Sequence, residues 1–220
     1  GKSTVLTQIA LQVPNSLYVA GEESAQQIKI RADRIIPKAN LLVLNEVDVD
    51  RIMATIENNK PSMVVIDSIQ TLETSDLDSV AGSISQVRES AHRLQRMAKS
   101  LHIPILLVGH VTKEGTIAGP KTLEHLVDVV LTLEGDPVSN FRVLRAQKNR
   151  FGPTDEVGIF EMEESGLVEV KNPSKLFLAQ KVDAPGSVVV ATMNGHRPIL
   201  VEIQALVTKS YLPSPRRTGS

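Results

Sequence analysis

The chain has 220 residues, of which 41% are hydrophobic and 22% charged, proportions typical of globular domains rather than of disordered or fibrous proteins. The net charge of −1 means that any nucleic-acid contact must come from a local basic patch, and the aromatic content of 3% argues against an aromatic platform for stacked bases. The absence of cysteine excludes disulfides and thiolate chemistry within this sequence, and without a signal peptide or an apolar run near the roughly 18 residues of a membrane span we expect no membrane association and a cytoplasmic location.

The chain opens with Gly1, Lys2, Ser3 and Thr4, which match the end of the phosphate-loop pattern G-x-x-x-x-G-K-[ST]. An apolar stripe at helical spacing follows and ends at Pro14. In the full pattern the backbone amides cradle phosphates, the lysine reaches the β- and γ-phosphate oxygens, and the hydroxyl ligates Mg²⁺. We therefore expect these four residues to bind nucleotide, in a domain that lacks, within this sequence, the first half of the loop and the strand before it.

Short apolar runs alternate with helical patterns along most of the sequence. We expect strands over residues 16–20, 41–44, 63–67, 103–109 and 127–133, and helices over 25–35, from 48 or 50 to 60, and over 84–101. This alternation predicts an α/β fold with a mostly parallel sheet flanked by helices. Strands over 142–147, 157–162 and 166–170 are expected to be antiparallel and to close one edge of that sheet. A second unit beginning near residue 183 contains a predicted hairpin, with strands over 187–193 and 199–207 and a turn at Asn194 and Gly195.

Acidic residues follow two of the predicted strands at their carboxyl ends. Ligands of open α/β sheets bind outside these ends, so Glu22, Glu23 and Asp67 should converge on the opening tetrapeptide. Asp67 is expected to hold a water of Mg²⁺ opposite Ser3, and a glutamate after the first strand suits a base for the attacking water. Since strand residues alternate in direction, only one of Glu22 and Glu23 can face the nucleotide, and the pattern does not select between them. The competing interpretation is that these carboxylates only cap turns.

A polar cluster and a segment between two glycines follow the predicted 103–109 strand. His110, with Thr112 and Lys113, follows the 103–109 strand and is placed to sense the γ-phosphate, or else belongs to a solvated loop. Gly115 and Gly119 bracket a segment that we expect to be mobile.

The segment 142–153 carries four basic residues and no acid: Arg142, Arg145, Lys148 and Arg150. It suits a DNA phosphate contact, fingers entering a neighbouring subunit's ATP site, or a solvated strand edge. The run Lys148-Asn149-Arg150-Phe151-Gly152 favours a positioned function over a random charge run.

On these motifs the chain resembles the bacterial RadA (Sms) family of RecA-like P-loop ATPases. The resemblance covers essentially the whole chain and is most specific at residues 148–152, with looser matches at residues 1–4, 18–24, 67–70, 85–89, 109–115 and 119–121. It implies a hexameric ring that uses ATP and Mg²⁺ to promote branch migration of recombination intermediates on single-stranded DNA alongside RecA.

Residue by residue, the resemblance implies that Lys2 and Ser3 bind phosphate and Mg²⁺, that Glu22 is the catalytic glutamate and that Asp67 is the Walker B carboxylate. Together with His110, Lys2 and Glu22 form the expected catalytic set. Lys148 and Arg150 would act across a subunit boundary or on DNA, and Lys113 and Lys121 belong to the expected DNA-facing loop.

The resemblance also implies a division into a RecA-like ATPase domain over residues 1–180 and the beginning of a Lon-protease-like α+β domain over 181–220. No Ser/Lys dyad is assignable in that piece, so we expect no peptidase activity. The four-cysteine zinc module typical of the family is absent from this sequence.

Two other functions remain open from the sequence. One is a DNA-binding assembly module in which ATP acts only as a switch for ring formation. The other is a RecA-fold regulatory ATPase without a nucleic-acid partner, which fits the near-zero net charge.

Overall fold

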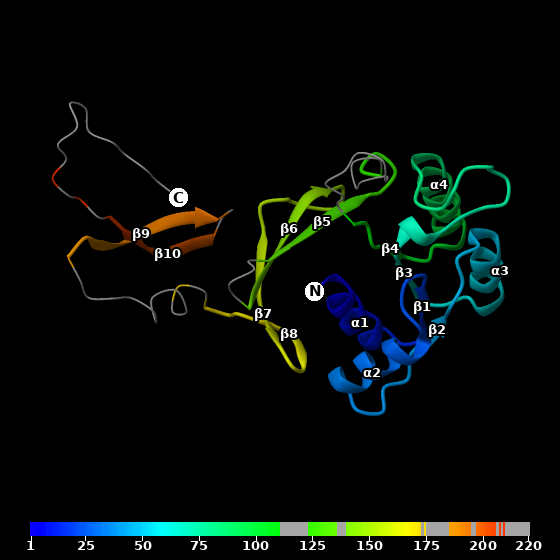
Figure 1. The fold of residues 1–220 in the computed structure, drawn as a ribbon, viewed down its shortest axis with the longest axis horizontal. Coiled ribbons are helices and arrows are strands. Elements are labelled where there is room, and N and C mark those ends of the chain that lie inside the picture. The colour runs from blue at the N-terminus through cyan, green and yellow to red at the C-terminus, as the bar shows by residue number, and fades with distance from the viewer. Residues whose placement is uncertain are drawn as a thin grey trace.

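The computed structural model describes residues 1–110, 123–135, 140–172, 174, 185–194, 197–205, 207 and 209. Its elements in chain order are α1 (Lys2–Gln12), β1 (Ser16–Ala20), α2 (Ala25–Ile35), β2 (Leu42–Leu44), α3 (Val49–Asn59), β3 (Met63–Asp67), the 3₁₀ turn η1 (Ile69–Thr71), α4 (Ile84–Leu101), β4 (Ile105–Leu107), β5 (Val129–Gly135), β6 (Phe141–Asn149), β7 (Val157–Glu163), β8 (Gly166–Glu169), β9 (Ser187–Asn194) and β10 (Arg197–Gln204). Figure 1 shows the helices gathered around the first four strands, with the later strands beyond the start of α1.

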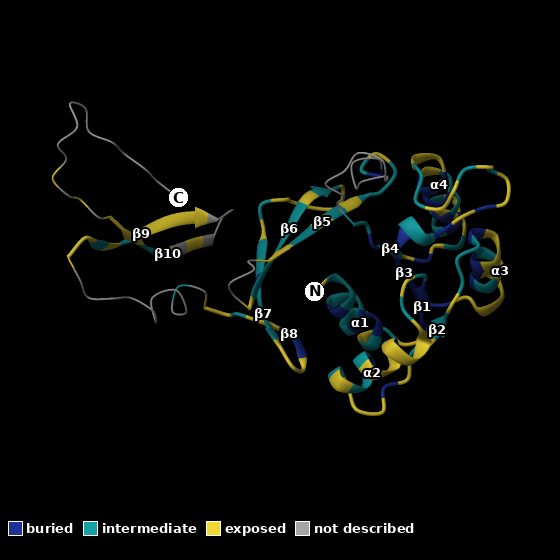
Figure 2. Cartoon of the chain, in the orientation of Figure 1, coloured by how far each residue is buried: buried dark blue, intermediate teal, exposed yellow. Residues whose placement is uncertain are grey.

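The first sheet has the order β2-β1-β3-β4, and all of its neighbouring strands are parallel. Alternate residues of β1 face opposite layers, as the period of a strand requires. Leu17 and Val19 pack with α3 and α4, whereas Tyr18 and Ala20 pack with α1 and α2. The sheet is therefore covered by helices on both faces, and the predicted α/β architecture is confirmed. In Figure 2 the buried residues concentrate where β1 and β3 pass between these layers.

Side-chain caps explain where the helices begin. Ser24 and Gln27 form a reciprocal capping box at the start of α2, and the Asp48 side chain accepts from the first backbone amides of α3. The Ser83 hydroxyl accepts from the Gln86 amide at the start of α4. Each cap satisfies amides that have no partner within the helix.

The strands after β4 form a sheet of their own. Its order is β5-β6-β7-β8 and every neighbouring pair is antiparallel. The prediction that these strands would close one edge of the parallel sheet is therefore wrong within the described part of the chain, and β5 belongs with the antiparallel strands. The strand expected over 103–109 is also shorter, because Ile103 still donates to the end of α4 and Pro104 has no N–H to donate.

Helix α1, which packs on the parallel sheet, also contacts the antiparallel sheet. The Gln8 side chain donates to the Leu167 carbonyl at 3.0 Å and accepts from the Leu167 amide at 2.8 Å, so it pairs with β8 as a neighbouring strand would. Gly166 beside it has φ +122°, and a Cβ there would lie 2.9 Å from the Gln8 side chain. The close approach of α1 to β8 therefore requires glycine at this position.

The predicted antiparallel pairing near the end of the chain is confirmed, although Asn194 of the expected turn belongs to β9 and Gly195 lies outside the described residues. β9 and β10 pair antiparallel from Ser187 opposite Gln204 to Asn194 opposite Arg197. Among the residues that the structure describes, no helix combines the length and the apolar character needed to span a membrane.

Candidate nucleotide-binding site

The opening tetrapeptide lies at the start of α1, as expected. Gly1 is the N-cap and Lys2 the first helical residue, so the free amides and the positive end of the helix dipole are available to an anion. The Lys2 ammonium group donates to the Gly109 carbonyl at 2.7 Å, which brings it to the end of β4. Ser3 is half-buried and Thr4 is buried within the same first turn.

Lys2 also lies close to both carboxylates expected at the site. Partial burial lowers the pKa of Lys2, while Asp67 and then Glu22 act in the opposite direction. Lys2 together with Asp67 and Glu22 carries a net negative charge, so a phosphate would bind here together with a cation such as Mg²⁺. The structure thus brings together residues from the ends of α1, β1 and β3.

Asp67 is the last residue of β3 and is buried, with 6% of its surface exposed. Its Oδ2 atom accepts a hydrogen bond of 2.6 Å from the Tyr18 hydroxyl. Burial, followed by the hydrogen bond to Asp67, raises the pKa of the Tyr18 phenol above its usual range. The phenol therefore stays protonated and donates to the carboxylate at physiological pH.

The two neighbouring glutamates point to different partners. Both Glu23 carboxylate oxygens accept from Arg31 Nη2 of α2. Glu22 Oε1 instead accepts from the buried Ser68 hydroxyl at 2.5 Å and lies 3.7 Å from His110 Nε2. Glu22 thus lies beside Lys2 and His110, and Glu23 is occupied by an ion pair on the α2 side.

The segment that carries these glutamates is held by backbone contacts. Gly21 N donates to the Asp67 carbonyl at 2.9 Å, which continues the β1–β3 pairing by one residue. The side-chain amide of Asn45 donates to the backbone carbonyl of Glu23 at 2.8 Å. A Cβ on Gly21 would lie 1.9 Å from Thr71 Oγ1, so this close approach admits no side chain. The position of Glu22 is therefore fixed by the strand ends and η1.

His110 follows β4 and is half-buried. Its backbone carbonyl accepts from Gln70 Nε2 at 3.2 Å, and its Nε2 atom is buried without a hydrogen bond in the part of the chain that the structure describes. The predicted loop residues Thr112, Lys113, Gly115, Gly119 and Lys121 lie outside the described residues.

Lys148 and Arg150 lie at the end of β6 and just beyond it. Lys148 Nζ donates to the carbonyls of Glu124 at 2.6 Å and Val127 at 2.8 Å, and Arg150 Nη1 pairs with Asp128 Oδ1 at 2.9 Å. Both cations therefore hold the segment that leads into β5, while Phe151 beside them is 81% exposed. Arg145 of the same basic segment lies 3.7 Å from Glu134 Oε2, so acids on neighbouring chain segments face part of this charge.

The side chains at this edge of the sheet fit ATP with Mg²⁺. Mg²⁺ prefers oxygen ligands and is commonly held by one or two protein groups together with phosphates and waters. The Ser3 hydroxyl and the buried Asp67 carboxylate provide such oxygens, and Lys2 at the helix start provides the cation for phosphate. A separate open cavity of about 310 Å³ is lined by Asn15, Ser16, Asn40 and Leu42. It lies at the opposite end of β1, away from all these groups.

Several residues of the site escaped the sequence analysis. Tyr18, Ser68 and Arg31 each bind one of the predicted carboxylates. Tyr18 did carry a usable signal, because a phenol in a fully buried apolar strand requires a hydrogen-bond partner. Ser68 and Arg31 offered none, since their partners depend on how β1, β3 and α2 pack.

Comparison with known proteins connects this geometry to a family. The profile of the AAA domain family matches residues 1–116. A protein of Bacillus subtilis (strain 168) named DNA repair protein RadA is 53% identical over 226 residues, which cover 100% of this chain and 49% of that protein. The RadA protein of Streptococcus pneumoniae (strain ATCC BAA-255 / R6) is 51% identical over 223 residues, covering 99% of this chain and 53% of the relative. The chain therefore spans about half the length of these relatives.

Solved structures show the same fold at lower identity. The RadB recombinase superposes with a TM-score of 0.54 and 19% identity, covering 78% of this chain and 86% of that one. A KaiC-like protein from the archaeon Pyrococcus horikoshii OT3 gives a TM-score of 0.57 and 18% identity, covering 77% of this chain and 84% of that one. The fold is RecA-like.

Proposed function

Because the chain belongs to the AAA domain family and is a RadA-like member of the RecA-fold ATPases, we propose that it is the ATPase core of a motor that acts on DNA in recombination and repair. The observation that carries this proposal is the convergence of Lys2, Glu22 and Asp67 at the carboxyl edge of one parallel sheet. This is where an open α/β fold binds its ligand.

Gly1, Lys2, Ser3 and Thr4 bind the nucleotide in this proposal. The amides at the start of α1 and the Lys2 ammonium group bind the phosphate oxygens, and Ser3 and Asp67 hold Mg²⁺ directly or through a water. When bound, Mg²⁺ neutralises charge on the phosphates. A phosphate that replaces the Gly109 carbonyl as the partner of Lys2 would release the end of β4, which couples β4 to nucleotide binding.

Glu22 is the proposed base. It accepts the proton of the attacking water as the oxygen of that water bonds to the γ-phosphorus and the bond to the bridging oxygen breaks, leaving ADP and phosphate. Its contact with His110 places the base next to the chain that enters the proposed DNA loop. The ion pair with Arg31 makes Glu23 the weaker candidate, because that carboxylate is already engaged.

We place the DNA contacts on the loop of Lys113 and Lys121, following the sequence resemblance. Lys148 and Arg150 act across a subunit boundary or on DNA. Their bonds to the segment 124–128, which follows that loop in the chain, support a role in transmitting its position. The exposed Phe151 offers an apolar contact at the same place.

The wider activity follows from the sequence resemblance and is proposed for the complete protein. It includes a hexameric ring, branch migration of recombination intermediates on single-stranded DNA, partnership with RecA and a cytoplasmic location. We also propose that the β9–β10 hairpin opens a Lon-protease-like domain over residues 181–220, after an ATPase domain over 1–180.

The experiment is ATP turnover by the complete protein with and without single-stranded DNA. Lys2→Ala should abolish the DNA-stimulated turnover, whereas Lys29→Ala, which removes an exposed lysine of α2, should keep it. Unchanged turnover in Lys2→Ala contradicts the proposal. If the wild type assembles with ATP yet hydrolyses almost none, ATP is only a switch for assembly. ATP turnover without any salt-dependent DNA binding indicates a regulatory ATPase instead.

Glu22→Gln and Glu23→Gln separate the two candidate bases. Glu22→Gln should lose about 10²–10⁴-fold in turnover, the usual contribution of a general base, while still binding ATP. Glu23→Gln should lose much less. The reverse order would assign the base to Glu23.

A further inference from the structure

Tyr18 has a hydroxyl group that packing alone does not explain. The side chain has no exposed surface and lies among apolar residues of α1, α2 and β3. Phenylalanine would fill this space equally well, and a hydroxyl buried without a partner costs free energy. The hydroxyl finds its partner in Asp67 Oδ2 at 2.6 Å. Tyr18 therefore serves Asp67 as well as the core.

This bond leaves the other oxygen of Asp67 for a ligand. The phenol occupies Oδ2, and rotation of the carboxylate would break the hydrogen bond in a site that is almost fully buried. The hydrogen bond from Tyr18 of β1 therefore determines the direction in which Asp67 Oδ1 points. A group that holds the far side of a metal-binding carboxylate commonly tunes the affinity for the metal.

The Thr7 hydroxyl on α1 has a different partner from the phenol. The buried Thr7 hydroxyl donates its proton to the Ser3 carbonyl at 2.7 Å, whereas the phenol donates its own proton to Asp67. Each hydroxyl has a single proton, so Tyr18 acts on Asp67 and Thr7 acts on the backbone of the first turn of α1.

The neighbouring carboxylate is held in a reciprocal way. Tyr18 of β1 donates to Asp67 of β3, and Ser68, directly after β3, donates to Glu22, which follows β1. The two strands are paired in parallel, with Ala20 opposite Asp67. Tyr18 and Ser68 thus serve different carboxylates, so their effects are separable.

We propose that Tyr18 is a positioning residue of the Mg²⁺ site, where its phenol orients the Asp67 carboxylate toward a metal held with Ser3. This inference rests on the proposed function of Ser3 and Asp67. It assigns to β1 a role in metal binding in addition to leading into the segment of Glu22.

The test is the Mg²⁺ dependence of ATP binding by the complete protein, measured with a fluorescent ATP analogue in EDTA and over a Mg²⁺ titration. Tyr18→Phe should bind the analogue in EDTA as the wild type does, and should need about tenfold more Mg²⁺ for the half-maximal gain in affinity. Ser68→Ala should leave the Mg²⁺ requirement unchanged and lower turnover.

Asp67→Asn distinguishes failure of this inference from failure of the site. If Asp67→Asn changes the Mg²⁺ requirement and Tyr18→Phe does not, the role of Tyr18 is overturned and the proposed function stands. If neither variant changes it, the metal assignment of Asp67 fails and the inference fails with it. A Tyr18→Phe protein with a lower melting temperature and equally weakened binding with and without Mg²⁺ has lost packing only, which also overturns the inference.

Discussion

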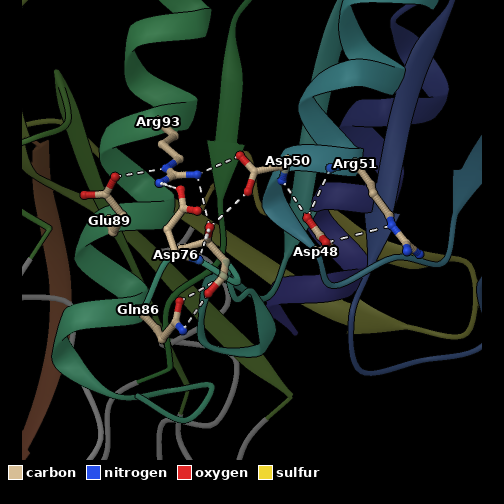
Figure 3. Close-up of polar contacts among 8 residues, drawn as sticks. Asp48, Asp50, Arg51, Asp76, Gln86, Glu89 and Arg93 are labelled. Atoms are coloured by element: carbon tan, nitrogen blue, oxygen red, sulfur yellow. Dashed lines mark hydrogen bonds and ion pairs between the residues drawn. The ribbon is translucent and has the colours of Figure 1, made fainter. Parts of the chain in front are cut away.

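Arg93 of α4 is the centre of the densest ionic network in the described part of the chain. It contacts Asp50 of α3 at 2.7 Å, Asp76 at 2.6 Å and Glu89 at 2.9 Å, and also donates to Thr74 Oγ1 at 3.0 Å (Figure 3). The hydrogen bonds that Arg93 donates to Asp76 and then to Glu89 raise the pKa of Arg93 above its usual range, so the guanidinium remains charged. Arg93 therefore joins α3 and α4 to the loop that follows η1.

The loss in free energy of unfolding expected on removing Arg93 depends on how exposed its ion pairs are. The Arg93 side chain is only 21% exposed, but its partners Asp50, Asp76 and Glu89 are 47%, 65% and 38% exposed. Exposed ion pairs contribute about 0.2–1 kcal/mol each. We therefore expect Arg93→Ala to lower the free energy of unfolding by roughly 1–2 kcal/mol, which corresponds to a fall in melting temperature of about 2–8 °C for a domain of this size.

The assay is urea and thermal unfolding, with Arg96→Ala as the matched control. Arg96 is an exposed arginine on the same helix, and its removal should change stability by less than about 0.5 kcal/mol. The difference between the two variants should shrink in high salt, which screens exposed pairs. Gln86, whose amide group binds Thr74 and Ser79 of the same loop, should keep that loop partly protected from proteases in Arg93→Ala. Equal stability of the two variants would refute this reasoning.

Three further predictions concern other contacts. Gly21→Ala places a Cβ 1.9 Å from Thr71 Oγ1, so it should cost about 1–3 kcal/mol in urea unfolding, and Thr71→Ala should restore part of that loss; wild-type stability in Gly21→Ala contradicts the geometry. Gln8→Ala removes both bonds to the buried Leu167 backbone and should cost about 1–3 kcal/mol, with Gln8→Glu intermediate; no loss would mean that water replaces the amide. The backbone N–H groups of Asp48 and then Val47 donate to the Glu46 carboxylate and lower its pKa. The stability that this carboxylate contributes is therefore present at neutral pH and is lost as the pH falls through the folded pKa. The stability difference between wild type and Glu46→Gln should therefore vanish in acid, and a difference that is constant with pH contradicts the shift.

The sequence itself determined the local elements. The helix after Lys2 ends before Pro14, and β1, β3 and the long α4 have the predicted bounds. These features depend on periodicity, caps and proline, which act over a few residues. The sequence also placed polar groups at the carboxyl ends of parallel strands, because strands that alternate with helices share one direction.

Only the tertiary structure decided which groups meet. Glu22 and Glu23 are equivalent in the sequence, and the packing of α2 gives Glu23 to Arg31 and leaves Glu22 beside Lys2. The same holds for the grouping of β5 with the antiparallel strands, since pairing between distant segments has no local signature. Tyr18 and Asp67 lie 49 positions apart in the chain, and the hydrogen bond between them exists because β1 and β3 pair and α1 covers them. Side-chain direction and distant pairing depend on the whole fold, so the sequence supplied the chemical groups and the packing selected their partners.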